Sequence, residues 1–596
     1  MNELRALLPY LRPYRRSYAV GLALVVLSNL LYTLGPRFLE RGIDAIRLGA
    51  SFGDVRRAVA LLVTVALLGG VARYGMRQLL NSESRRVETD LRDRLYRHLQ
   101  RMSAEFYDRY PTGDVMARAT NDLLAVRMVA GPALMYLMDT ITRALLIAPA
   151  MLAISPRLTL LTLCPLAGLP AAMIVLGRRI HRRSEAIQAQ FSTLTSQAHE
   201  NLSGVRVVRA YRQEAAEIGV FQRMSEEYLR RNLALARLQG LFYPLLALLG
   251  GVSALAVLYT GGRLVMTGDV SVGAFVAFGV YLAMLVWPMV ALGWGFNLIQ
   301  RGAASMARIN EMFRQEPAIT TPPDPVRLPP ARAGRSVEFR GVWFTYPGAR
   351  ERGWVLQDVS FRVEAGRSLA IVGATGAGKS TVVDLLGRAY DPDRGDILID
   401  GVDLRRLSLD DLHRELGLVP QETFLFSETL RDNVLLGAPD DGRLERVAEV
   451  AQLSEALPAL PDGFDTVLGE RGVNLSGGQK QRAAIARALA QDPPVFVLDD
   501  ALSAVDAQTE AKILAALRGA LQDRTSVIVS HRLAAVRDAD WIVVLDGGRV
   551  VEQGVHAHLI SRRGRYWELL QRQQLEAELE QEDGVEARAA GGETPG

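Results

Sequence analysis

Residues 368–380 read Ser-Leu-Ala-Ile-Val-Gly-Ala-Thr-Gly-Ala-Gly-Lys-Ser. The run from Ser368 to Val372 is typical of a buried strand, and a helical pattern follows Lys379. Glycines between a strand and a helix let backbone N–H groups close around phosphates, and the N-terminus of the helix adds a favourable dipole. This order of strand, loop and helix therefore predicts a phosphate-binding loop in an α/β domain.

The loop supplies a set of residues that we expect to contact a nucleotide: Gly373, Thr375, Gly376, Ala377, Gly378, Lys379, Ser380 and Thr381. Lys379 is expected to reach the β and γ phosphates, and the Ser380 hydroxyl is expected to bind Mg²⁺. A second apolar strand, residues 495–498, ends in Asp499, a carboxylate suited to hold the magnesium shell through water. Alone, these two motifs fit many nucleotide-binding proteins.

Between the two motifs lies Leu475-Ser476-Gly477-Gly478-Gln479, and with it the chain resembles the ABC ATPase family. In that family the serine, the glycine backbones and the following helix bind the γ-phosphate held by the opposing ATPase domain. The resemblance implies ATP and Mg²⁺ as cofactors. It also implies further roles in family order: Tyr346 stacks on adenine, Gln421 touches magnesium and senses the membrane half, Ser503 to Asp506 bridge the dimer, and His531 contacts the γ-phosphate.

Six apolar stretches precede residue 305, each near the ~20 residues that a helix needs to cross a bilayer. They lie at 18–38, 57–80, 132–154, 157–178, 240–265 and 273–298. Long arginine-bearing arms join the second stretch to the third and the fourth to the fifth, which predicts a multi-pass cell-membrane protein with both termini cytosolic. The loop after the first stretch runs against this rule, because it carries Arg41, Arg47, Arg56 and Arg57.

The arginines also bear on the partners of the chain. The formal net charge of +4 suggests nucleic acid, but the arginines cluster between apolar runs, so we expect a lipid bilayer and no nucleic acid. Inside the third stretch, Asp139 and Arg143 invite contact with a polar substrate, although their i, i+4 spacing also lets them neutralise each other. The single cysteine, Cys164, cannot form an intramolecular disulfide and is interpreted as a small apolar filler.

The expected fold is a membrane all-α domain of six spans fused to an α/β P-loop ATPase domain. Its parts are a transmembrane domain at 1–313, a proline-rich linker at 314–335, an ABC nucleotide-binding domain at 336–570 and an acidic, disordered tail at 571–596. Fused spans, long arms and the loop 466–472 resemble the exporter branch of the family. Phe106–Asp114 and Gly204–Tyr211 look like its two coupling helices, and ordinary helical packing is the alternative.

One position departs from the family. The family has a glutamate after the magnesium aspartate, where it orients the attacking water, and this chain has Asp500. A carboxylate that is one methylene shorter sits about 1.5 Å farther back, and such a displacement can cost on the order of 10²-fold in rate. A working conservative swap is the alternative. This pattern, a shortened carboxylate together with an intact signature, resembles that of the heterodimeric, Mdl-like exporters. In those exporters each of two ATP sites is formed by both chains, and one of the two sites is slow.

The resemblance thus implies an exporter half-subunit that moves an amphipathic drug, lipid or peptide outward by alternating access. Its expected partner is a second ABC half-exporter in a heterodimer, and its expected catalytic residues are Asp500, His531 and Gln421. Two alternatives stay open: a homodimeric lipid or drug flippase, and an ATP-gated regulatory membrane protein on the same fold.

Overall fold

The computed structural model describes residues 2–331, 333–532 and 536–575, without the side chains of 164–174 and of a few other positions. The chain divides into two compact units. The helical unit comprises Met1–Gln100 and Thr112–Gln315, and the α/β unit comprises Arg101–Pro111 and Glu316–Gly596.

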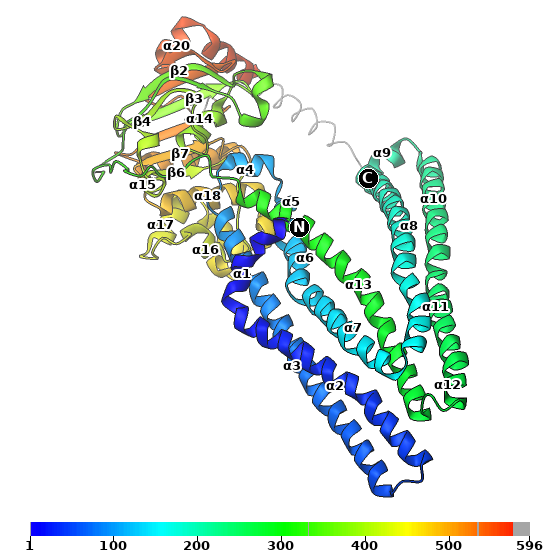
Figure 1. Ribbon diagram of the computed structural model, residues 1–596. Helices are drawn as coiled ribbons and strands as arrows, with labels where there is room; N and C mark the ends of the chain where they lie inside the picture. Colours follow the sequence, from blue (N-terminus) through cyan, green and yellow to red (C-terminus); the bar gives the residue numbers. More distant parts are fainter. Residues whose placement is uncertain (1, 332, 533–535, 576–596) are drawn as a thin grey trace. The chain divides into compact units, whose positions relative to one another are not determined.

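The helical unit consists of long helices joined by short turns (Figure 1). Their bounds are α1 Leu8–Leu11, α2 Arg15–Arg47, α3 Phe52–Leu99, α5 Thr112–Ala117, α6 Leu123–Met128, α7 Leu134–Ile154, α8 Pro156–Ser203, α9 Val205–Ala210, α10 Glu214–Gly240, α11 Phe242–Ala256, α12 Gly262–Met266 and α13 Val272–Phe313. π-Helical turns connect α5 to α6, α6 to α7 and α11 to α12, so these segments continue one another.

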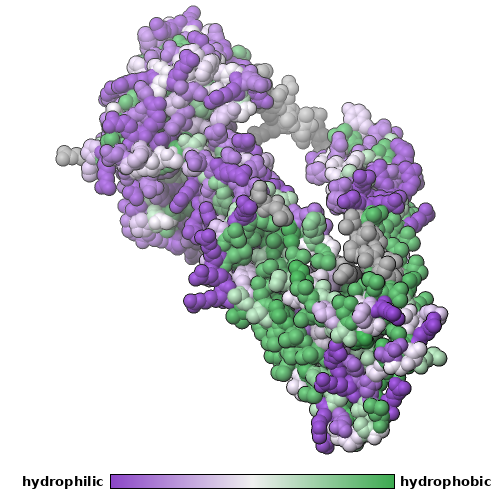
Figure 2. Space-filling model, viewed as in Figure 1, coloured by the Kyte–Doolittle hydropathy of each residue, from purple (hydrophilic) through white to green (hydrophobic). Residues whose placement is uncertain are grey.

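All six apolar stretches are helical. Among the described residues, three helical segments are long and apolar enough to cross a membrane: Glu3–Arg47, Phe52–Leu99 and Thr112–Ile154. Two shorter apolar segments are Gly250–Met266 and Val272–Leu285. The fourth stretch lies in α8, where the side chain of Cys164 is outside the described residues. Figure 2 shows hydrophobic residues gathered along these helices, while the visible surface of the α/β unit is mostly hydrophilic.

The second polar arm is a helical pair. Helices α8 and α10 are joined through the short helix α9, and side chains from each helix bond the backbone of the other. Gln190 donates to the Met224 carbonyl at 3.2 Å, and Arg231 donates to the Ala186 carbonyl at 2.9 Å. The helix α9 falls within the segment Gly204–Tyr211, as the sequence predicted.

The α/β unit contains two sheets. The four-stranded sheet has the order β2-β1-β4-β5, and the six-stranded sheet has the order β10-β9-β3-β8-β7-β6, in which only β10 is antiparallel. The strands are β1 Val337–Phe344, β2 Leu356–Val363, β3 Ser368–Gly373, β4 Arg394–Ile399, β5 Val402–Asp403, β6 Leu416–Val419, β7 Val495–Asp499, β8 Thr525–Val529, β9 Trp541–Asp546 and β10 Arg549–Gly554. Parallel order places the carboxyl ends of β3, β6, β7 and β8 at one edge.

Helices surround these sheets and bury two large apolar clusters against them (Figure 1). They are α14 Lys379–Leu386, α15 Leu409–Glu415, α16 Leu430–Leu435, α17 Arg443–Val450, α18 Gly477–Ala490, α19 Ala507–Ala520 and α20 His556–Arg562. Residues 565–575 are also helical, and the rest of the expected tail lies outside the described residues.

The segment 101–111, which lies in the first cytosolic arm of the predicted transmembrane domain, groups with the α/β unit. It forms α4, Ala104–Arg109, and Ala104 packs against the core cluster that residues of both sheets form. The short helix predicted within Phe106–Asp114 is present with different bounds, because α4 ends at Arg109 and α5 begins at Thr112. Tyr110 is extended at φ −115° and ψ 98°, because a residue before proline, here Pro111, disfavours the helical conformation.

Candidate nucleotide site

The loop between β3 and α14 has a backbone conformation that strongly favours glycine at two positions. Gly376 and Gly378 have φ of +82° and +97°, in the left-handed region. A Cβ on Gly378 would also lie 2.7 Å from Leu356 Cδ2, and one on Gly373 would lie 2.2 Å from the Leu545 carbonyl oxygen. The loop is therefore closely packed from behind, which leaves its N–H groups to face a bound anion.

Lys379 begins α14, and its ammonium lies back over the loop. Its Nζ donates to the carbonyls of Gly373 and Ala374, both at 2.9 Å. Burial lowers the pKa of Lys379, and the nearby carboxylates of Asp500 and Asp499 oppose this shift. Two neutral carbonyls compensate a desolvated ammonium only in part, so this cation is suited to a polyphosphate.

The predicted magnesium residues Ser380 and Asp499 meet at the edge of the sheet. The Ser380 hydroxyl donates to Asp499 Oδ1 at 3.2 Å. Asp499 is buried at the end of β7, and burial raises the pKa of its carboxyl. Gln421 is exposed two residues beyond β6, which pairs with β7 through Val419 and Leu498, so it lies at the same edge. Hydroxyl, carboxylate and amide oxygens are ligands that fit Mg²⁺.

The described residues contain no group of three or more His, Cys, Asp and Glu side chains placed to hold a metal ion. A magnesium ion here would be bound by few protein oxygens together with phosphate oxygens, which is how this ion is usually held at nucleotide sites.

Tyr346 follows β1, and its side chain contacts residues of α14 through its hydroxyl. Its hydroxyl lies 3.1 Å from Thr381 Oγ1 and donates to Asp384 at 2.9 Å. Burial raises the pKa of Tyr346 to about 12. Its ring meets those of Phe344 and Tyr390 edge to face, with centroids 5.0 Å and 5.2 Å away. The ring proposed for adenine is thereby fixed to the helix that follows the phosphate loop.

Asp500 and His531 come from adjacent strand ends. Asp500 follows β7 and His531 lies two residues beyond β8, and Asp500 Oδ1 is 2.7 Å from His531 Nδ1. The backbone of Asp500 has φ +46°, a conformation that Asp tolerates better than most residues. The shorter carboxylate therefore still reaches the histidine.

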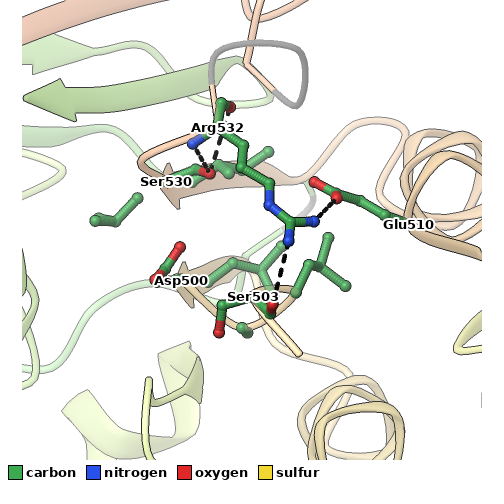
Figure 3. Close-up of a pocket in the computed structure, with 10 residues that line it drawn as sticks. Asp500, Ser503, Glu510, Ser530 and Arg532 are labelled. Atoms are coloured by element: carbon green, nitrogen blue, oxygen red, sulfur yellow. Dashed lines mark hydrogen bonds and ion pairs between the residues drawn. The ribbon is translucent and has the colours of Figure 1, made fainter. Parts of the chain in front are cut away.

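The sequence analysis predicted no role for Arg532, whose side chain holds the loop next to Asp500 in place. Its guanidinium forms an ion pair with Glu510 and donates to the Ser503 carbonyl at 3.2 Å. Figure 3 shows these side chains lining a pocket together with Asp500 and Ser530. The only sequence signal was an arginine directly after the predicted histidine, which does not reveal its long-range partners.

The signature segment caps α18. The Gln479 N–H donates to the Ser476 hydroxyl at 3.3 Å, and the Ser476 N–H donates to the Gln479 side chain at 2.8 Å. Ser476 and Gly477 are exposed, and Gly478 packs so closely that a Cβ would lie 3.1 Å from the Ala504 carbonyl oxygen. Among the described residues, no hydrogen bond joins the signature segment to the phosphate loop of the same chain.

Gln481, also missed, links the signature helix to the segment Ser503–Asp506. Its buried side chain donates to the Ser503 hydroxyl and accepts from the Ala504 N–H, both at 3.0 Å. The segment that follows Asp500 is thus held by the signature helix through Gln481 and by Arg532. The structure therefore brings the loop, magnesium, Asp500 and His531 positions together at one edge, and presents the signature segment separately.

The chain matches two family descriptions: "ABC transporter transmembrane region" over residues 18–289 and "ABC transporter" over residues 356–503. It is 38% identical to the probable multidrug resistance ABC transporter ATP-binding/permease protein YheI of Bacillus subtilis, over 95% of this chain and 97% of that one. It is 36% identical to the multidrug resistance-like ATP-binding protein MdlA of Escherichia coli, over 96% of each.

Two further similarities concern a lipid flippase and a solved structure. The ATP-dependent lipid A-core flippase of Syntrophus aciditrophicus is 32% identical, over 98% of this chain and 96% of that protein. The structure of a bacterial Atm1-family ABC exporter with ATP bound has a TM-score of 0.76 and 28% identity, and covers 94% of this chain and 99% of its own.

Proposed function

Because the chain belongs to the ABC transporter family and is an ATP-driven exporter, we propose that it works in a heterodimer and carries the slower of two ATP sites. The observation that carries this proposal is the combination of Asp500 with an intact signature at Ser476–Gln479. The exposed Ser476 and Gly477 are available to a second ATPase domain, whereas the chain's own phosphate loop is served by the shortened carboxylate.

The roles of the site residues follow from their positions. We propose that the loop of residues 373–378 and Lys379 bind the phosphates, and that Tyr346 stacks on the adenine. Ser380, Asp499 and Gln421 would hold Mg²⁺, which neutralises charge that develops on the phosphates during transfer. Asp500 would orient the attacking water as general base, and His531 would hold that carboxylate while facing the γ-phosphate.

The slow rate follows from the reach of Asp500. Its carboxylate is engaged with His531, and one methylene fewer leaves it about 1.5 Å behind the position of a glutamate. General-base catalysis requires contact with the water at ordinary hydrogen-bond length, so this gap lowers the rate rather than the binding of ATP. The site would therefore bind nucleotide firmly and turn it over slowly.

Coupling between transport and hydrolysis is proposed to pass through α4. Asp108 of α4 accepts a hydrogen bond from Tyr390, whose ring contacts Tyr346, and Tyr346 in turn bonds Asp384 on α14. A short helix from the first arm is thus connected to the nucleotide site by direct contacts. We propose that α9 makes the equivalent contact on the partner subunit, since Val207 and Tyr211 are exposed at the tip of the second arm.

The substrate class and topology are also proposals. The names of the relatives mention multidrug resistance and a lipid flippase, which supports an amphipathic drug or lipid as cargo, and a short peptide fits the same chemistry. The two arginine-bearing arms and the ATPase domain support a cell-membrane location with both termini in the cytosol.

Transport by proteoliposomes distinguishes these proposals from the two alternatives. The chain and its partner, expressed together, should move a fluorescent amphiphile only with ATP, and neither chain alone should match the mixed complex. Equal transport by the chain alone would favour a homodimeric flippase. ATP-dependent ion conductance without movement of the amphiphile would favour a gated regulatory protein.

A further inference from the structure

The helix of residues 565–575 packs on one face of the six-stranded sheet. Its start is capped by Glu552 of β10, whose carboxylate accepts from the N–H groups of Arg565 at 2.8 Å and Tyr566 at 3.0 Å. A carboxylate at a helix N-terminus also interacts favourably with the helix dipole. Residues 571–575, which the sequence analysis assigned to the tail, continue this helix.

One face of this helix is apolar except at its last position. Tyr566, Leu569 and Leu570 belong to, or pack against, an apolar cluster that includes Ala370 of β3, and Tyr566 is fully buried. Gln573 follows Tyr566 by seven residues. The spacing i, i+3, i+4 and i+7 places all four side chains on the same face of a helix. Gln573 is therefore the polar end of a face that packs on the sheet.

The side chain of Gln573 contacts the loop that carries His531. Its amide N–H donates to the backbone carbonyl of His531. The ring of the same residue meets the proposed general base, because His531 Nδ1 lies 2.7 Å from Asp500 Oδ1. His531 is thus held at its backbone by the helix of residues 565–575 and at its ring by Asp500.

The contact at the carbonyl matters because the backbone of His531 decides where its ring can lie. His531 is two residues beyond the end of β8, and its side chain is half exposed. A hydrogen bond to the carbonyl of His531 fixes the plane of the peptide bond that follows it. A displacement of about 1 Å at a reacting centre can cost on the order of 10²-fold in rate. Gln573 can therefore change the rate of hydrolysis through the position of the imidazole.

We propose that Gln573 is a positioning residue that fixes His531 for ATP hydrolysis at the chain's own ATP site. This inference rests on the proposed function, in which His531 faces the γ-phosphate and holds Asp500. Packing of Leu569 and Leu570 against the cluster that includes residues of β3 connects this helix to the strand that leads into the phosphate loop. The amide of Gln573 thereby relates the position of His531 to that of the loop.

The test compares two neighbouring glutamines in the purified full-length chain. Gln573→Met keeps the length of the side chain and removes the N–H donor. Gln574→Met is the matched control, because Gln574 is exposed on the same helix and its side-chain carbonyl accepts from Gln571 at 3.2 Å.

Hydrolysis of radiolabelled ATP with Mg²⁺ is followed in a single turnover, with the chain in excess, so that a slow site is resolved. We expect Gln573→Met to lower the single-turnover rate about five- to tenfold, and Gln574→Met to leave it close to that of the parent. The affinity for trinitrophenyl-ATP and the thermal midpoint should be the same in both variants, because the proposed contact positions a catalytic group and not the nucleotide.

A double-substitution cycle separates positioning of the ring from a general structural role. In a His531→Ala background the backbone carbonyl is still present, so Gln573→Met still removes the hydrogen bond, but no imidazole remains to be displaced. We therefore expect Gln573→Met to have no further effect on the residual rate of His531→Ala. A general loss of packing would lower the rate in both backgrounds.

Three results would overturn the proposal: an unchanged single-turnover rate in Gln573→Met, an equal loss in the parent and His531→Ala backgrounds, or weaker nucleotide binding with an unchanged rate. If His531→Ala itself left the rate unchanged, the role proposed for His531 would fail together with that of Gln573. A normal rate in Gln573→Met beside a low rate in His531→Ala would refute the role of Gln573 alone.

Discussion

The hydroxyl of Tyr390 donates a 2.5 Å hydrogen bond to the carboxylate of Asp108, across 282 positions of the sequence. Burial and the adjacent Asp108 raise the pKa of Tyr390, so the phenol stays protonated and remains the donor. Because Tyr390 also contacts Tyr346, this bond connects α4 of the first arm to the proposed adenine platform.

Replacing Tyr390 with Phe should uncouple hydrolysis from transport. A hydrogen bond to a partly exposed carboxylate contributes about 1 kcal/mol, so docking of α4 should weaken roughly fivefold. We expect basal ATPase activity to persist while its stimulation by transported amphiphile falls. The measurement is the ratio of stimulated to basal ATPase activity in proteoliposomes. Tyr566→Phe is the control, because it removes another buried hydroxyl, 2.7 Å from His556, far from α4 in sequence.

An unchanged stimulation ratio in Tyr390→Phe would contradict coupling through this bond. A fall of equal size in Tyr566→Phe would show that the effect is a general loss of stability in the α/β unit.

Ser476 and Asp500 should differ in their effect on the mixed complex. In the proposed heterodimer, Ser476→Ala would remove a contact to the γ-phosphate at the faster site, and we expect a loss on the order of 10²-fold in ATPase rate. Asp500→Asn would affect only the proposed slow site and should cost far less. Thr429→Ala is the control for loss of a helix cap, since Thr429 caps α16 as Ser476 caps α18.

Steady-state ATPase assays on the mixed complexes decide this point. If Asp500→Asn abolished hydrolysis while Ser476→Ala left it near normal, the fast and slow sites would be exchanged and Asp500 would be a working base.

The buried carboxylate of Asp499, a proposed metal ligand, should destabilise the folded state of the nucleotide-free protein. Burial raises its pKa above that of an unfolded Asp, so stability is lost as pH rises through the interval between those two values. Above that interval the penalty is fully present. Asp499→Asn should therefore raise the thermal midpoint of the nucleotide-free protein, and should reduce the additional stabilisation by Mg²⁺ with ATP over ATP with EDTA.

Asp540 provides a control, because its substitution is expected to change the thermal midpoint in the opposite direction. Burial raises its pKa, but hydrogen bonds from Ser368 and the ion pair with Arg367 outweigh burial and leave the pKa lowered. Its stability contribution is present above the unfolded pKa, so Asp540→Asn should lower the midpoint at neutral pH. A lower midpoint in both variants would refute the burial argument for Asp499.

The phosphate loop could be predicted from sequence because its signals are local. Glycine spacing, an apolar strand and a helix start all lie within residues 368–386, and the fold keeps them adjacent. The i, i+4 pair in α7 was predictable for the same reason. Asp500 was recognisable from its place directly after Asp499.

Contacts between distant segments could not be predicted. Nothing near Asp108 indicates Tyr390, and Arg73 gives no sign that it shares the ring of Tyr32 with Arg143. Gln481 resembles any polar residue of an exposed helix, yet it is buried and bonds the Ser503 segment. Such pairs depend on how helices and strands pack, and helical periodicity contains no information about the partner side chain.

The proposed topology, with both termini in the cytosol, predicts which engineered cysteines an impermeant reagent can reach. Ser155, at the turn between α7 and α8, is buried and caps α8, so the exposed loop at Asp269 is the better site. In a Cys164→Ala background, Asp269→Cys should be modified on intact cells, whereas Ala511→Cys in the ATPase domain should react only after lysis. If Ala511→Cys were modified on intact cells and Asp269→Cys only after lysis, the termini would lie outside the cell.

We propose that the short carboxylate of Asp500 limits the ATPase rate of the chain's own ATP site, and the substitution Asp500→Glu isolates this effect. In the purified chain alone, restoring the methylene should raise the ATPase rate by up to about 10²-fold with little change in KM for ATP. His531→Ala in the Asp500→Glu background should remove most of the gain. An Asp500→Glu protein that stays folded by thermal unfolding but hydrolyses ATP no faster than the parent would contradict the claim.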